Sequence, residues 1–276
     1  MKGKKSNVFI YIILTILAVV FLAPIFIILF NSFKGKLYIS DAPFKLPTAE
    51  TFSGLQNYID GLSKTGFLSA FGWSIFITFF STIVIVLFTA MTGWYITRSK
   101  TKVSTSLYFI FVFSMIVPFQ MVMFTMSKVA NMLNLDNPVG LIVLYIGFGA
   151  GLSIFMFSGF VKSIPIDIEE AALIDGCNPI KTFFLIVLPL LKPICITVAI
   201  LNVMWIWNDY LLPSLVLKSD YKTIPMAVQY LRGGYGAIDM GAMMAVLVLA
   251  IIPIIIFYLT CQKYIIEGVA AGAVKG

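Results

Sequence analysis

The chain has 276 residues, of which 60% are hydrophobic and 11% are charged, and its formal net charge is +7. Soluble domains carry about a quarter charged residues, so this composition excludes an ordinary soluble protein and indicates that lipid is the main solvent. The positive charge forms no basic patch with interleaved polar residues, which argues against nucleic-acid binding. Histidine is absent and the cysteines, Cys177, Cys195 and Cys261, lie far apart, so no metal site is expected.

Six apolar runs are long enough to cross a membrane, and they predict an all-α, polytopic integral membrane protein with six transmembrane helices. The first run is too long for the apolar core of a cleaved signal peptide, so we expect a retained span. None of the runs contains Asp, Glu, Lys or Arg. In chain order they are Val8–Phe30, a run within Phe67–Thr97, roughly Leu107–Ser127 with Pro118 inside, Pro138–Val161, Pro193 to about Trp207, and roughly Met240–Cys261.

The placement of basic residues predicts the orientation of these spans. The short connection after the second run holds Arg98, Lys100 and Lys102 and no acid, whereas the connection 128–137 holds one base and one acid. Because cytoplasmic loops are enriched in Lys and Arg, the first of these connections is expected in the cytoplasm. Both chain termini are then expected in the cytoplasm.

Two connections on the outer side are long. Residues 31–66 include an amphipathic piece, Phe52–Leu62, and residues 208–239 include Gly233-Gly234. Lys34 and Lys64 are assigned to the outer side. Neither segment has a hydrophobic periodicity strong enough to predict a separate domain.

Polar residues within the spans have two interpretations, helix–helix packing and the wall of a solute path. Small and hydroxylated residues gather on one face of the second span and of the fourth, where packing is the favoured interpretation. The amides of Gln120 and Asn202 are candidates for either role. Asn208 and Asp209, at the outer end of the fifth span, either cap a helix or contact the solute or an external protein. The residues on the two small-residue faces are Ser74, Thr78, Thr82, Thr89 and Gly93, and Gly147, Gly151 and Ser158.

Residues 162–192, between the fourth and fifth spans, predict two short helices outside the membrane. Pro165 suits a first helical turn, and the acids that follow it suit the positive end of the helix dipole. Gly176 suits a left-handed stop, and Asn178-Pro179 predicts the start of the second helix. On the first helix Ile168, Ala171, Ala172 and Asp175 are expected on one face. Amphipathic helices that rest on lipid headgroups are rich in Lys and Arg, whereas this helix is acidic, so a protein-docking role is favoured.

The same segment resembles a known family motif. Glu170-Ala171-Ala172, followed by Gly176 and then by Ile186, Leu188 and Pro189, is similar at every fixed position to the coupling motif of ATP-binding-cassette importer permeases. The tail Ala271–Gly276 and the stretch Trp207–Pro213 resemble the shorter membrane subunit of maltose-type carbohydrate importers. The resemblance covers essentially the whole chain.

The resemblance implies a coupling helix, with Asp175 beside the motif, that is seated in a groove of a cytoplasmic ATPase. It implies a second, homologous permease, two ATPase subunits that bind ATP and magnesium, and an extracytoplasmic solute-binding protein. No cofactor is expected on this chain. A loop matching Arg232, Gly233, Gly234, Tyr235 and Gly236 reaches into the binding protein in such relatives, whereas the residues alone are also compatible with an ordinary glycine-rich loop.

The predicted function is therefore a non-enzymatic permease subunit of a carbohydrate importer. The chain has no G-x-x-x-x-G-K-[ST] phosphate loop, and it has no ionisable residue inside the spans of the kind that ion-coupled carriers commonly use. A permease for another small polar solute such as glycerol phosphate stays open, as do an ion-coupled secondary transporter and, third, a membrane-embedded enzyme. The expected divisions are residues 1–66 for the first span and outer segment, 67–262 for the permease core and 263–276 for a cytoplasmic tail.

Overall fold

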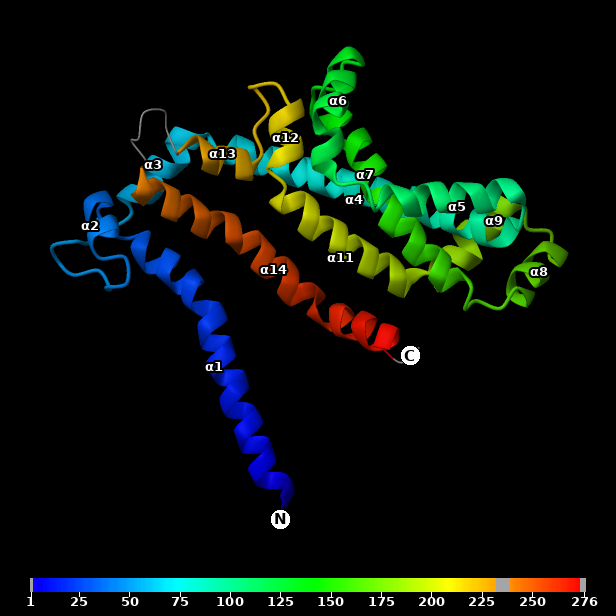
Figure 1. Cartoon of the computed structure of the whole chain (residues 1–276), viewed down its shortest axis with the longest axis horizontal. Coiled ribbons are helices and arrows are strands. Elements are labelled where there is room, and N and C mark those ends of the chain that lie inside the picture. Colours follow the sequence, from blue (N-terminus) through cyan, green and yellow to red (C-terminus); the bar gives the residue numbers. More distant parts are fainter. Residues whose placement is uncertain (1, 232–238, 274–276) are drawn as a thin grey trace. The chain divides into compact units, whose positions relative to one another are not determined.

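The computed structural model describes residues 2–231 and 239–273, and the regular elements within these ranges are helical. An isolated antiparallel bridge joins Lys34 and Phe52. The chain divides into two compact units, one formed by Met1–Ala70 with Met226–Ile255 and the other by Phe71–Pro225 with Ile256–Gly276. Most helices of both units are labelled in Figure 1.

The first unit contains α1 (Lys2–Asn31), α2 (Lys36–Asp41), α3 (Gln56–Thr65), most of α13 (Ile224–Tyr230) and the first part of α14 (Met240–Ala273). The buried amide of Asn57 on α3 donates to the carbonyl oxygens of Ser32 at 2.8 Å and Lys34 at 2.7 Å. Because a buried polar group must be hydrogen-bonded, these contacts fasten the segment after α1 to α3. The predicted amphipathic piece of this segment is thus confirmed as a helix, α3.

The side chain of Lys34, which the sequence assigns to the outer side, is fully buried. The Nζ atom donates to the carbonyl oxygen of Ala42 at 2.9 Å and lies 5.1 Å from the centroid of the Phe30 ring. Burial lowers the pKa of this amine below its ordinary value. The carbonyl and the ring face replace part of the hydration that the ammonium group loses.

The second unit is built around α7 (Pro138–Val161). Helices α5 (Lys102–Ser114) and α11 (Lys192–Asn208) pack against it, and α12 (Leu211–Val216) packs against α6 (Phe119–Met132) (Figure 1). Where α4 (Phe67–Ser99) meets α7, a Cβ atom on Gly93 would lie 2.8 Å from the Cβ of Phe157. A residue without a side chain permits this close approach, so the packing interpretation of the small-residue face is confirmed at Gly93.

Within residues 2–231 and 239–273, four helices are long and apolar enough to cross a membrane, and two bent helix pairs raise the number to as many as six if each pair is one span. The predicted span Pro138–Val161 is confirmed as α7, and α4 contains the predicted second run. The first span, Val8–Asn31, lies within α1, and α14 continues past the predicted end at Cys261 to Ala273.

The third predicted span is not one continuous helix. It is the pair α5 and α6, which meet at an angle of 105° around Pro118, the N-cap of α6. Proline lacks the N–H that would continue the α5 ladder, and it disfavours a helical conformation at the residue before it. The fifth span is likewise preceded by a 78° bend, between Pro179–Leu190 and Lys192–Asn208.

Candidate functional site

The candidate docking segment begins with α8 (Asp167–Ile174), whose first turn carries Asp167, Glu169 and Glu170. Pro165 lies before the helix rather than in its first turn, which corrects the predicted start. The helix ends as predicted at Gly176, where φ is +83°. The amide of Cys177 donates to the carbonyl oxygen of Ala172 at 3.0 Å, so the left-handed glycine closes the last turn.

The two faces of α8 have different environments. Glu169 and Ala172 are buried, whereas Glu170 and Ala171 are exposed. The prediction that one face contains both motif alanines is therefore wrong in part, because Ala172 points toward the rest of the unit and Ala171 points away from it. Two large apolar side chains, Leu173 and Ile174, are 53% and 86% exposed.

Glu169 connects α8 to α4. Its Oε1 accepts hydrogen bonds from Nε of Arg98 at 2.9 Å and from Nη2 of Arg98 at 2.7 Å, and its Oε2 accepts one from Nε1 of Trp94 at 2.8 Å. Nη2 of Arg98 also donates to the carbonyl oxygen of Ile164 at 2.9 Å. Sequence reasoning assigned Glu169 to the helix start and missed this network, since nothing in the local pattern pairs residues so far apart in the chain.

The chain from Gly176 to α11 passes through three short elements, which are α9 (Pro179–Thr182), the π-helix η1 (Phe183–Val187) and α10 (Leu188–Leu190). The side chain of Asn178 accepts from the amide of Lys181 at 2.9 Å, which confirms the predicted cap. Among the remaining motif residues, Ile186 and Leu188 are half-buried and Pro189 is exposed. Leu188 packs against a core that includes Phe157, Phe183, Val187 and Leu191.

The residues predicted as candidates for a solute path lie in different local environments. The buried amide of Asn202 donates to Oγ of Ser153 on α7 at 3.3 Å and to the carbonyl oxygen of Val198 at 2.8 Å. This geometry supports an interhelical link for Asn202. Gln120 is exposed in the first turn of α6, and Asn208 is exposed and donates to the carbonyl oxygen of Met204.

Asp209 lies at the junction of α11 and α12, where hydrogen bonds hold its carboxylate. Its Oδ1 accepts from the amide of Leu211 at 2.9 Å, and its Oδ2 accepts from the hydroxyl of Tyr145 at 2.9 Å. The Tyr145 ring also meets Trp205 edge to face. Asp209 therefore accepts hydrogen bonds from the first turn of α12 and ties this turn to α7, which favours the alternative of a role at a helix end.

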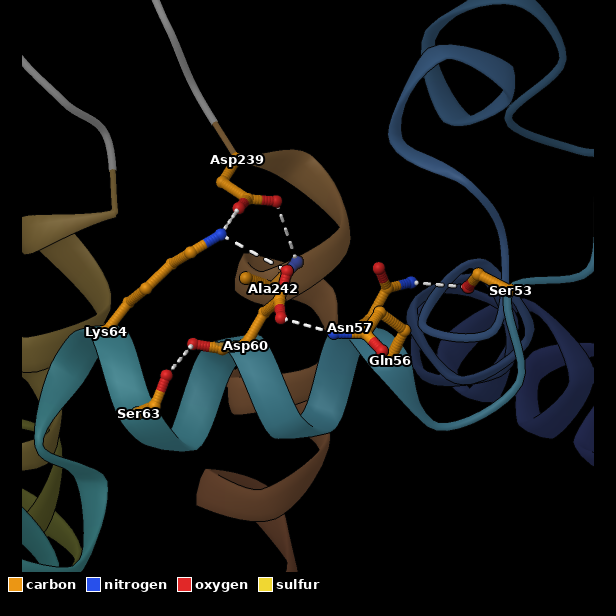
Figure 2. A network of polar contacts seen from close by, with 8 residues as sticks. All are labelled: Ser53, Gln56, Asn57, Asp60, Ser63, Lys64, Asp239 and Ala242. Atoms are coloured by element: carbon orange, nitrogen blue, oxygen red, sulfur yellow. Dashed lines mark hydrogen bonds and ion pairs between the residues drawn. The ribbon is translucent and has the colours of Figure 1, made fainter.

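A second polar network lies in the first unit (Figure 2). Nζ of Lys64 is 2.6 Å from Oδ2 of Asp239 and 3.2 Å from Oδ2 of Asp60. Oδ1 of Asp239 accepts from the amide of Ala242, and the amide of Asp239 donates to the carbonyl oxygen of Leu231 at 3.4 Å. Asp239 thus links α3 to the start of α14 and to Leu231, the residue that follows α13.

The charges of this network shift both pKa values in the directions that favour the ion pair. Hydrogen bonds to Asp239 and Asp60 raise the pKa of Lys64. Burial alone would raise the pKa of Asp239, but the hydrogen bonds from Lys64 and from the Ala242 amide, with the charge of Lys64, hold it below the ordinary value. The candidate loop itself, Arg232, Gly233, Gly234, Tyr235 and Gly236, lies outside the described residues.

Within residues 2–231 and 239–273, no three Cys, Asp or Glu side chains come together in a way that could hold a metal ion. On a helix between two candidate spans, an exposed surface is formed by Glu170, Ala171, Leu173 and Ile174, and we call it the docking surface after its predicted role. A short helix that exposes large apolar side chains beside a carboxylate is suited to contact with another protein.

Comparisons with known proteins point to one family. Residues 86–270 match the family model described as the binding-protein-dependent transport system inner membrane component. A probable starch degradation products transport system permease protein of Thermoanaerobacterium thermosulfurigenes is 39% identical over 261 residues, which are 94% of each chain. A multiple sugar-binding transport system permease protein of Streptococcus mutans is 36% identical over 280 residues, 99% of each chain.

The fold is also similar to a solved structure, that of a bacterial ABC transporter involved in the import of the acidic polysaccharide alginate. The TM-score is 0.79 at 25% sequence identity, and the match covers 95% of this chain and 97% of that one.

Proposed function

The chain belongs to the family of binding-protein-dependent transport system inner membrane components, and from this membership we propose that it is a permease subunit of an ATP-binding-cassette importer for a carbohydrate. The cargo is a sugar or an oligosaccharide. The names of the two relatives and of the solved structure refer to starch degradation products, multiple sugars and alginate, all of which are carbohydrates. A chain similar to the first two over nearly its full length is suited to the same class of solute.

The observation that carries this proposal is the docking surface of α8. Ile174 and Leu173 extend from a helix that lies between two candidate membrane spans, and the exposed Glu170 stands beside them. Such a surface fits a groove that has an apolar floor and an arginine or lysine at its rim. In the proposed complex this groove belongs to a cytoplasmic ATPase, and the motif from Glu170 to Gly176, with Ile186, Leu188 and Pro189, is the coupling segment.

The proposed assembly has this chain beside a second homologous permease, with two ATPase subunits in the cytoplasm and a solute-binding protein outside. ATP and magnesium are bound by the ATPase subunits, and this chain performs no covalent chemistry. Six spans follow when each bent helix pair within the described residues counts as one. An even number leaves both termini on the same side, and the basic connection with Arg98, Lys100 and Lys102 supports the cytoplasmic side of a bacterial cell. The permease core is residues 67–262, between the first span with its outer segment, 1–66, and the tail, 263–276.

Alternating access follows from this arrangement. Closure of the two ATPases on ATP moves the docked helices, and the packed bundles rock between inward-facing and outward-facing states around a path between the permeases. The residues proposed to adjoin that path are Gln120 and Asn208, whereas Asn202 and Asp209 are proposed to link neighbouring helices beside it. The residues proposed to contact the binding protein are Arg232, Gly233, Gly234, Tyr235 and Gly236.

The test is a charge reversal on the docking surface. Glu170→Arg is expected to abolish solute uptake and to release the ATPase from membranes, because it places a cation opposite the basic rim of the groove. Glu50→Arg makes the same charge change at another exposed carboxylate and is the matched control. Retention of the ATPase and of full uptake by Glu170→Arg would refute the proposed docking.

The energy source and the cargo have their own measurements. Uptake that collapses with an uncoupler while cellular ATP is held constant would contradict the importer and favour an ion-coupled carrier. A thermal-shift screen of the cognate binding protein against mono- and oligosaccharides, with glycerol phosphate included, identifies the solute. Stabilisation by glycerol phosphate alone would replace the carbohydrate assignment by the other solute class.

A further inference from the structure

The face of α8 opposite the docking surface holds a buried, hydrogen-bonded carboxylate, that of Glu169. The side chain of Glu169 is 8% exposed and that of Arg98 is 19% exposed. Glu169 accepts three hydrogen bonds from two residues of α4, and Arg98 bonds to the main chain just before α8 as well. We call Glu169, Arg98 and Trp94 the brace.

The brace is a specific connection rather than a loose surface pair. A buried ion pair is tolerated only when further hydrogen bonds satisfy both partners, and here both carboxylate oxygens have donors. The planar guanidinium uses two of its donors on one oxygen, which fixes its orientation as well as its distance. The Trp94 ring also lies 5.5 Å from the Phe183 ring, centroid to centroid, so the same side chain contacts η1.

The covalent route from α8 to α11 is, by comparison, interrupted. It passes through the left-handed Gly176, the four-residue α9, the π-helix η1 and a 78° bend. Each interruption is a point at which a movement of α8 can be absorbed by backbone dihedral angles rather than passed on. The brace avoids these points, since it joins α8 directly to the last turns of α4, one of the four long helices.

We propose that Glu169, Arg98 and Trp94 are positioning residues that make α4 follow α8, so that movement of the docking surface reaches a second span without passing along the chain. This inference rests on the proposed docking of α8 on an ATPase. It makes α4, in addition to α11, a helix that moves with α8. It also gives two adjacent carboxylates different functions. Glu170 faces the partner, and Glu169 holds the helix to its own subunit.

The test compares the amount of ATP hydrolysed per molecule of solute imported. Purified complexes that carry Glu169→Gln or Arg98→Gln are reconstituted in vesicles with the binding protein and the oligosaccharide selected by the thermal-shift screen. The docking surface is unchanged in these variants, so the ATPase subunits are expected to co-purify. The ratio of ATP hydrolysed to solute imported is expected to rise by about 2- to 30-fold, the range for residues that carry coupling between distant sites.

A milder variant keeps the proposal testable if a charge deletion prevents assembly. Trp94→Phe removes one donor to Glu169 but keeps an aromatic ring against Phe183, so the complex is expected to assemble with a smaller rise in the same ratio. A merely structural role would lower assembly, hydrolysis and uptake together and leave the ratio unchanged. An unchanged ratio in every variant that assembles would overturn the proposal.

The outcomes also separate this inference from the function on which it rests. If Glu170→Arg releases the ATPase while the brace variants keep both docking and the normal ratio, docking stands and the brace has no role in coupling. If the wild-type chain binds no ATPase, the proposed function fails, and the inference fails with it.

Discussion

Gly93 gives the sharpest test of how α4 and α7 are packed. A Cβ atom added at this position would lie 2.8 Å from the Cβ of Phe157 and 3.2 Å from the amide nitrogen of Ser158. Carbon atoms in contact are normally about 3.5–4.0 Å apart, so Gly93→Ala requires the helices to separate by about 1 Å. Neither obstacle is the flexible end of a side chain, and therefore neither can move without its backbone.

The expected cost of Gly93→Ala is about 1–3 kcal/mol, as for other overpacked cores. Replacement of glycine by alanine inside a helix also contributes about 0.5–1 kcal/mol of stabilisation, which has to be subtracted. Gly72→Ala on the same helix supplies this correction, because nothing in the structure lies within 4 Å of its added Cβ. Gly93→Ala should therefore be less stable than Gly72→Ala by about 1–3 kcal/mol.

The assay is thermal denaturation of the purified complex, with the folded fraction read by size-exclusion chromatography after heating. A difference of 1 kcal/mol corresponds to about 2–4 °C in the midpoint for a chain of this size. Equal midpoints for Gly93→Ala and Gly72→Ala would refute the close contact of α4 with α7.

Three further substitutions probe the polar contacts, each by the same denaturation assay. Asp239→Asn should lower the free energy of unfolding by about 0.2–1 kcal/mol at pH 7, since Lys64 is half-exposed. Because the pKa of Asp239 is lowered and that of Lys64 is raised in the folded state, the ion pair stabilises the protein between about pH 4 and pH 10. The difference from wild type should vanish as the pH falls below the folded-state pKa of Asp239. A difference that persists there would exclude the ion pair as its source. Asn178→Ala should cost about 1 kcal/mol by removing the cap on the Lys181 amide, and no change would contradict that cap. Asn202→Ala should cost about 1–3 kcal/mol while uptake by the assembled complex persists; selective loss of uptake would instead favour the solute path.

The elements that could be predicted from the sequence are those fixed by local chemistry. The span Pro138–Val161 begins after Asn137, whose side chain accepts from the amide of Gly140, and proline occupies the first helical turn. The end of α8 at Gly176 is similarly local, since glycine adopts a positive φ without the steric cost of a Cβ. Each of these signals lies within a few residues of the feature it determines.

The elements that could not be predicted depend on partners far along the chain. Pro118 predicts an interruption, but the 105° angle between α5 and α6 depends on tertiary contacts such as the hydrogen bond from Ser127 to the carbonyl oxygen of Leu215. The burial of Lys34 could not be predicted, because nothing beside it in the sequence offers a carbonyl in the right place. The place of Glu169 in the first turn of α8 is confirmed, but its hydrogen bonds could not be predicted, since their donors come from α4.

The placement of ionisable groups bears on how the transporter is driven. Proton coupling requires a group that binds and releases a proton as the path opens to one side and then to the other. The carboxylate of Glu169 is held by three hydrogen bonds from α4, and Asp209 is engaged by Tyr145 and by the first turn of α12. Asp209 lies at the end of α11 and Glu169 in the first turn of α8, and each holds neighbouring elements in position. Their hydrogen bonds agree with a subunit whose helices are moved by a partner, and the exposed Glu170 on α8 is the carboxylate proposed to meet that partner.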